Sequence, residues 1–89
     1  MPAHDDLLKQ AVAAALAGEW DQSHRIVQQY GDRTACWIHA VLHKIEGDEF
    51  NSRYWYARSA ADYEDFPDAM QELRAIQQQL DSAQPESGR

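Results

Sequence analysis

Four side chains that could bind a metal ion or move a proton follow one another at helical spacing in the middle of the chain. They are Cys36, His39, His43 and Glu46, and separations of three, four and three residues place them on one face of a helix. Two histidines four residues apart can chelate a single ion from one helical face. The helix is otherwise apolar nearly all round, so we expect it to be central in a bundle, with its polar stripe facing a neighbour or a cleft.

Two hairpins that share this helix would bring further side chains to the stripe. The dipeptides at 31–32 and 47–48, each a glycine followed by aspartate, are typical of the turn between two helices. Antiparallel helices joined at these turns place residues of both neighbours at the height of His39 and His43. The side chains brought to that height are Trp20, His24, Ser52, Trp55 and Tyr56.

The first interpretation of this group is a metal site. His24, His39 and His43 would form a three-histidine site with one open position, which suits Zn²⁺ or another divalent transition metal. Glu46 lies about 10 Å along the helix axis from His39, so it reaches His43 more easily than the same ion. We expect it either as a hydrogen-bond acceptor or as the general base of a small metallohydrolase.

The second interpretation is a structural polar network that needs no metal and no cofactor. In that case Tyr56, Ser52, Glu46 or backbone carbonyls would satisfy His39 and His43. A network of this kind would give an alanine-rich core a unique packing.

The third interpretation is a binding or adaptor module with a histidine and aromatic pocket centred on residues 33–46, and we expect binding ahead of catalysis. Aromatic walls with a few convergent polar groups are typical of ligand sites, whether the ligand is a small molecule or a protein. Tyr54 lies off the presumed core face, close to Arg53 and Arg58, as in many interaction surfaces. The predicted binding residues are Trp20, His24, His39, His43, Glu46, Tyr54, Trp55 and Tyr56.

Composition and charge exclude several classes of partner. Eight Lys and Arg stand against fifteen Asp and Glu in 89 residues, which gives a net charge of −7. Nucleic acids and anionic membranes both attract basic surfaces, so neither is an expected partner. A single cysteine forms no internal disulfide and the acidic N-terminus lacks the apolar core of a signal peptide, so we expect a cytoplasmic protein. No apolar run approaches the roughly 20 residues of a membrane span.

Helix formers and sparse glycines predict an all-α chain. Each predicted helix begins beside an acidic residue that can cap it, including Asp32, Asp48 and Asp65. An acidic run from Asp62 to Glu72 is expected to be a solvated turn leading into the last helix. The predicted helices cover residues 5–17, 19–30, 33–46, 49–63 and 67–80.

A weak internal repeat predicts how these helices stack. A shift of 29 residues superposes small residues and turns of the first helix pair on those of the second. We therefore expect about five short antiparallel helices stacked as helix-turn-helix pairs, in one domain over residues 1–81 with a flexible polar tail over 82–89. The open ends of such a stack favour a homodimer. The superposed pairs are Ala11 and Ala40, Gly18 and Gly47, and Ser23 and Ser52.

Two resemblances agree with this architecture. The run from His39 to Arg58, H-A-V-L-H-K-I-E-G-D-E-F-N-S-R-Y-W-Y-A-R, resembles a family of small, uncharacterised microbial helical proteins with the motif H-A-x-L-H-x-x-E-G-D-x-x-N-x-x-Y-W-Y-x-R. Trp20 and His24 fit the same pattern. The run from Asn51 to Ala60 resembles the second helix of Sel-type and tetratricopeptide repeats. Both resemblances imply a helical fold and neither implies a particular chemistry.

Overall fold

The chain is all-α over residues 3–82, the part that the computed structural model describes, and this confirms the predicted fold class. No strand occurs in that range. No helix within it combines the length and the apolar character needed to cross a membrane. The five helices are α1 (His4–Leu16), α2 (Trp20–Val27), α3 (Arg33–Ile45), α4 (Glu49–Tyr56) and α5 (Ala69–Ser82).

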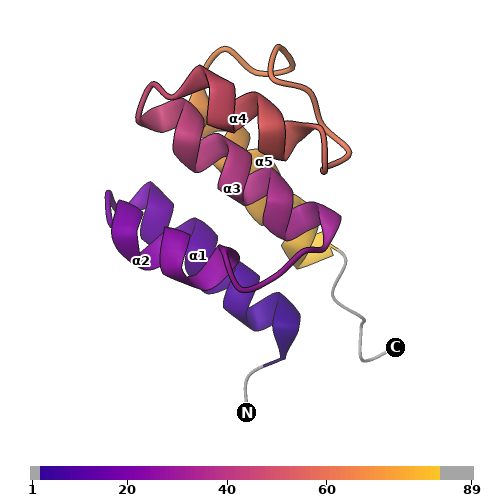
Figure 1. The fold of residues 1–89 in the computed structure, drawn as a ribbon. Helices are drawn as coiled ribbons and strands as arrows, with labels where there is room; N and C mark the ends of the chain where they lie inside the picture. The colour runs from indigo at the N-terminus through magenta and orange to yellow at the C-terminus, as the bar shows by residue number, and fades with distance from the viewer. Residues whose placement is uncertain (1–2, 83–89) are drawn as a thin grey trace.

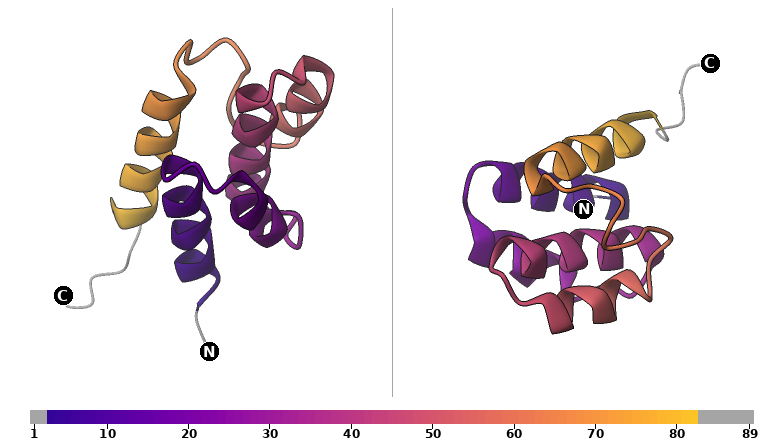
Figure 2. Two further views of the ribbon diagram at one scale, coloured as in Figure 1. Left: turned by 90° about the vertical axis from the view of Figure 1, so that its left-hand side faces the viewer. Right: turned by 90° about the horizontal axis from the view of Figure 1, so that it is seen from above.

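Helix α3 occupies the centre of the molecule. It packs against all four other helices, whereas α4 packs mainly against α3 and reaches α5 through the Tyr56 hydroxyl. Figure 1 shows α1 beside α2 and α3 beside α4, with α5 behind them, and the right-hand view of Figure 2 places α4 and α5 on opposite sides of α3. The apolar residues Ile38, Val41 and Leu42 are completely buried. The prediction that this helix is central is therefore correct.

Tight turns position the two helix pairs. Gly18 and Gly47 have φ angles of 84° and 82°, in the left-handed region that glycine adopts without a steric penalty. The Asp32 carboxylate accepts a hydrogen bond from the backbone N–H of Ala35, and Asp48 accepts one from the N–H of Asn51. These caps begin α3 and α4 at the predicted residues.

The helix bounds of the first pair recur 29 residues later in the second. Helices α1 and α3 both have 13 residues, and α2 and α4 both have 8. Ser23 and Ser52 occupy matching positions and are completely buried, as are Ala11 and Ala40. The two pairs are therefore alike in length, turn and buried small residues.

Two predicted helix ends are wrong. Helix α2 stops at Val27 rather than Tyr30, and α4 stops at Tyr56 rather than residue 63. At the end of α4 the Ser59 hydroxyl donates to the Tyr56 carbonyl and accepts from the N–H of Ala61, so it replaces helical hydrogen bonds. Residues 57–68 form an irregular connection as a result.

The start of α5 also differs from the prediction. Asp68, not Asp65, caps the helix by accepting from the N–H of Met70. Asp65 instead accepts from the N–H of Asp62 inside the connection. Ser82 is the last residue of α5, and the rest of the predicted tail lies outside the described residues.

Candidate metal centre

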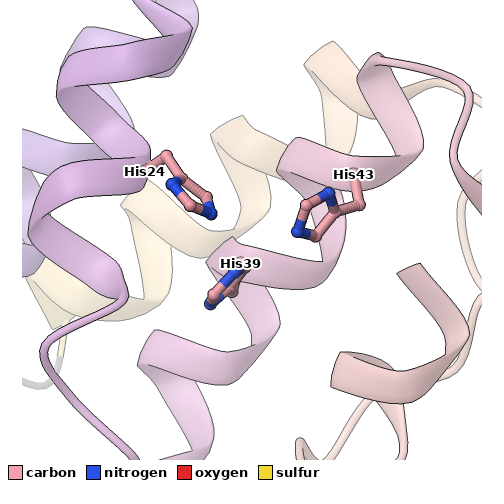
Figure 3. Close-up of side chains that lie close together, drawn as sticks. All are labelled: His24, His39 and His43. Carbon is pink, nitrogen blue, oxygen red and sulfur yellow. The ribbon is translucent and has the colours of Figure 1, made fainter. Parts of the chain in front are cut away.

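Three imidazole rings from two helices face one another beside α3. His24 comes from α2, and His39 and His43 lie one turn apart on α3 (Figure 3). One ring nitrogen of each residue lies within 4.8 Å of those of the other two. His39 is 4% exposed, His43 is 9% exposed and His24 is half-buried. The sequence prediction that these three side chains meet is thus realised in the fold.

Trp20 fixes α2 against α3 beside the three histidines. Its indole N–H donates to the Leu42 carbonyl at 2.7 Å. The indole also stacks on the ring of His24, with centroids 4.8 Å apart and planes 12° apart. One side chain therefore contacts both the backbone of α3 and the ring of His24.

Trp55 forms the opposite wall from α4. Its ring stacks on that of His39 with a centroid distance of 4.0 Å and an interplanar angle of 12°. The two tryptophans flank the cluster as the sequence predicts. Apolar rings around a site exclude water and hold its polar groups in fixed orientations.

Glu46 contacts the Nδ1 atom of the His43 ring. Its carboxylate lies 2.7 Å from Nδ1 of His43, which leaves Nε2 as the nitrogen available to an ion. A carboxylate on the second ring nitrogen fixes the tautomer and raises the basicity of a ligand histidine. The contact corresponds to the first of the two predicted roles of Glu46, the hydrogen-bond acceptor. Asp48 lies near both residues, but its carboxylate caps α4.

Neither His24 nor His39 makes a hydrogen bond to any residue in the range 3–82. Burial, together with a contribution from the neighbouring His24 and His43, lowers the pKa of His39 from 6.5 to about 4. Burial and His43 also lower the pKa of His24. At neutral pH the His39 ring is therefore uncharged, which is the form that binds a metal ion.

The structure does not bring Tyr56 and Ser52 to the histidines. The Tyr56 hydroxyl donates to Glu72 of α5, and the Ser52 hydroxyl donates to the Ala40 carbonyl. The structural network predicted for His39 is therefore wrong, since neither hydroxyl nor any described carbonyl contacts that ring. Equal height along a hairpin fixes the level of a residue but not the face on which it lies.

Tyr54 and Cys36 also lie apart from the cluster. Tyr54 is 46% exposed, and its hydroxyl accepts from Arg58, whose guanidinium lies over the ring. The Cys36 thiol is directed to the Gly31 carbonyl at 3.7 Å, and burial raises its pKa. Neither side chain therefore contributes to the three-histidine group.

Sequence reasoning missed a second polar cluster on another face of α3. Glu72 of α5 was expected in a solvated run, but it is completely buried. It accepts from the Lys44 ammonium, the Trp37 indole and the Tyr56 hydroxyl. The signal was present, because Glu72 lies on the stripe of α5 that also carries Leu73 and Ile76.

Comparison with family models, with curated proteins and with solved structures gives no match to this chain.

The chemistry available to the three histidines follows from the geometry described above. Three imidazoles with one open position form a ligand set for Zn²⁺, Cu²⁺, Ni²⁺ or Co²⁺ and not for Mg²⁺ or Ca²⁺, which prefer oxygen ligands.

Proposed function

We propose that this chain binds one divalent transition-metal ion through His24, His39 and His43. One observation carries the proposal: three imidazoles converge at a largely buried point, and the rings of His24 and His39 have no hydrogen-bond partner in the described chain. Among the described residues, Ser23 Oγ is the only buried side-chain N or O atom without a partner, so the unpaired imidazole nitrogens can be reached from solvent and are open to an ion. A metal ion would use those nitrogen lone pairs.

The distances are compatible with that ion after small ring movements. Tetrahedral zinc with bonds of 2.0–2.1 Å separates its ligand nitrogens by about 3.3–3.4 Å. The three nitrogens lie within 4.8 Å of one another, so their separations need to shrink by no more than about 1.5 Å. Rotation of His24, the most exposed of the three rings, supplies part of this movement. His43 is already oriented by Glu46.

The matching helix α1 carries no histidine at the positions that correspond to His39 and His43. In the matching helix α1, Gln10 stands where α3 has His39, and Ala14 stands where it has His43. Helix α1 has the same length and ends at the same kind of glycine turn. A helix of this length and turn therefore occurs in the same chain without histidines at these positions, and this supports a role of His39 and His43 in binding.

Titration of tag-free, chelator-treated protein with Zn²⁺ and Co²⁺ tests the proposal. We expect one ion per chain, a higher melting temperature with Zn²⁺ and a tetrahedral Co²⁺ absorption spectrum. Trp20 and Trp55 stack on ligand rings, so bound Cu²⁺ or Ni²⁺ should quench their fluorescence. His39→Ala and His24→Ala should each weaken binding by roughly 100-fold or more, and Glu46→Gln by roughly 10-fold or more.

His4→Ala is the matched control, because His4 is the fourth histidine of the chain and lies outside the cluster. It should bind Zn²⁺ like the unmodified protein. Far-UV circular dichroism in EDTA shows whether each variant is folded. If folded His39→Ala and His24→Ala retain one tight ion, or if His4→Ala loses it equally, the three-histidine site is disproved.

A second candidate function, self-association through α4, rests on a different observation. Phe50 is 82% exposed and Tyr54 is 46% exposed, and they lie one turn apart on α4. Glu49 pairs with Arg53 and Arg58 donates to Tyr54 within the chain, and an antiparallel pair of α4 helices would bring Glu49 and Arg58 of opposite copies close together. We propose a weak homodimer through this face.

Sedimentation velocity should show dimers whose fraction rises with protein concentration. Phe50→Ser should abolish these dimers, and the exposed α2 variant Gln22→Ser should retain them. A chain that is still monomeric at about 1 mM would refute the proposal.

A further inference from the structure

A cavity of about 400 Å³ lies on a different face of α3 from the metal centre. It is bounded by the first turns of α3, by the connection 57–68 and by α5. Its volume falls within the range of small-molecule sites in proteins, which is about 300–1,000 Å³. The side chains that matter for recognition are Arg33, Thr34, Trp37, Asp65, Phe66 and Gln79.

The apolar walls of this cavity are held in place. The indole N–H of Trp37 donates to the buried Glu72 carboxylate at 2.8 Å. The Lys44 ammonium donates to the backbone carbonyls of Tyr63 and Phe66, both at 3.0 Å. These bonds tie the connection to α3, so Trp37 and Phe66 face the cavity from fixed positions. A pre-formed cavity binds a ligand without an ordering cost.

The polar groups of the cavity have free capacity. Neither the Arg33 guanidinium nor the Thr34 hydroxyl bonds to any residue in the described range. Arg33 stands in the first turn of α3, where the helix dipole disfavours a cation and attracts an anion. Asp65 uses one carboxylate oxygen for the N–H of Asp62, and no group in the described range hydrogen-bonds to the other. No ion pair joins Arg33 to Asp65.

We propose that this cavity binds a small zwitterion with an apolar body, of the class of α-amino acids with an aromatic or large aliphatic side chain. The ligand carboxylate pairs with Arg33 and the hydroxyl of Thr34. Its ammonium group pairs with Asp65, and its side chain packs on Trp37 and Phe66. An anion alone would be opposed by Asp65 and a cation alone by Arg33, so only a ligand with both charges matches the two groups.

Calorimetric titration with three related compounds tests this inference. L-phenylalanine carries both charges, 3-phenylpropionate lacks the ammonium group and 2-phenylethylamine lacks the carboxylate. We expect L-phenylalanine to bind with a Kd of about 0.1–1 mM, as suits a ligand of this size. Each analogue should bind at least about 10-fold more weakly, because each loses one charge pair. EDTA in the buffer makes the result independent of the metal centre.

Variants of exposed residues locate the binding site. Arg33→Gln and Asp65→Asn should each weaken L-phenylalanine binding about 10-fold, because each removes one charge pair. The amide introduced by Asp65→Asn still offers an oxygen to the N–H of Asp62, so the connection keeps its shape. Arg74→Gln, an exposed α5 change outside the cavity, should bind normally. Equal binding of all three compounds, unchanged binding in Arg33→Gln, or no binding of L-phenylalanine at about 10 mM would each overturn the proposal.

Discussion

The two polar clusters on α3 differ in how completely their hydrogen bonds are satisfied. Around Glu72, the Lys44 ammonium makes three bonds, one to the carboxylate and two to backbone carbonyls, which uses all three of its donors. Trp37 and Tyr56 donate to the same carboxylate. Around His39, by contrast, two of three imidazoles bond to no described group, and only His43 has a partner, Glu46.

This difference separates structure from binding capacity. The saturated cluster around Glu72 has no free hydrogen-bonding group left to bind a ligand. Its hydrogen bonds link α3, α4, α5 and the connection 57–68. An unsaturated cluster whose nitrogens are not sealed in the core keeps lone pairs for an ion. Substitutions in the Glu72 cluster should therefore change the free energy of unfolding, and substitutions in the histidine cluster should change the metal affinity. Neither set should have much effect on the other quantity.

The largest effect that follows from this comparison is expected for Glu72→Ala. The change leaves the Lys44 ammonium buried without its counter-ion and two neutral donors without an acceptor. Removing one partner of a buried ion pair costs about 3–5 kcal/mol. Urea unfolding followed by circular dichroism should show this loss, while exposed Glu64→Ala should cost less than about 1 kcal/mol.

A domain of this length has only about 5–13 kcal/mol of stability, so a loss of this size is enough to unfold a weakly stable chain. Glu72→Gln keeps the shape and one acceptor oxygen, and it should lose less than the alanine variant while remaining folded. Neither folded variant should alter Zn²⁺ affinity by more than about 3-fold, because the two clusters share no side chain. A Glu72→Ala protein as stable as the unmodified chain would contradict the structural role of the saturated cluster.

The histidine cluster should instead show itself in the pH dependence of stability. The folded pKa of His39, about 4, lies below its unfolded value of 6.5. Above pH 6.5 the ring is neutral in both states, so it contributes no pH dependence. As the pH falls from 6.5 towards 4, the unfolded chain takes up a proton that the folded chain rejects, and the free energy of unfolding decreases.

The expected loss from His39 between about pH 7 and about pH 5 is about 2 kcal/mol, with a further loss in the same direction from His24. Urea titrations in EDTA at the two pH values measure it. His39→Gln should remove most of this loss, and His4→Gln should retain it. A chain equally stable at both pH values would show that the fold tolerates a charged His39.

Helix periodicity and turn geometry were sufficient to predict the three-histidine group. The spacing of His39 and His43 fixes their common face, and the short turn at Gly31 fixes the height of His24 on the neighbouring helix. The same geometry predicted Trp20 and Trp55 as walls. These features depend on contacts within one hairpin, where the residue number determines the position along the axis.

Features that depend on distant segments were not predicted. Trp55 and Tyr56 are neighbours, yet about 100° of helical rotation directs Trp55 to His39 and Tyr56 to Glu72. The partners of Glu72 come from α3 and α4, and they are separated from it by 16 to 35 residues. The apolar stripe of α5 marks Glu72 as facing the core, but acidic residues are rarely buried without a partner, and the sequence did not identify Lys44 as that partner.

The smallest expected effect compares a satisfied and an unsatisfied hydroxyl at matching positions of the two helix pairs. Ser52 and Ser23 are both completely buried; the Ser52 hydroxyl donates to the Ala40 carbonyl at 2.7 Å, and the Ser23 hydroxyl has no partner. Ser52→Ala should cost about 0.5–1.5 kcal/mol, the net value of one buried hydrogen bond. Ser23→Ala should be neutral or stabilising by up to about 1 kcal/mol, since it removes an unsatisfied buried oxygen.

Each variant is the control for the other in urea unfolding, because the helix position, the burial and the change in side-chain volume are the same for both. Equal losses of unfolding free energy in the two variants would mean that the Ser23 hydroxyl finds an acceptor in solution. The difference between satisfied and unsatisfied polar groups would then apply only to the two clusters on α3.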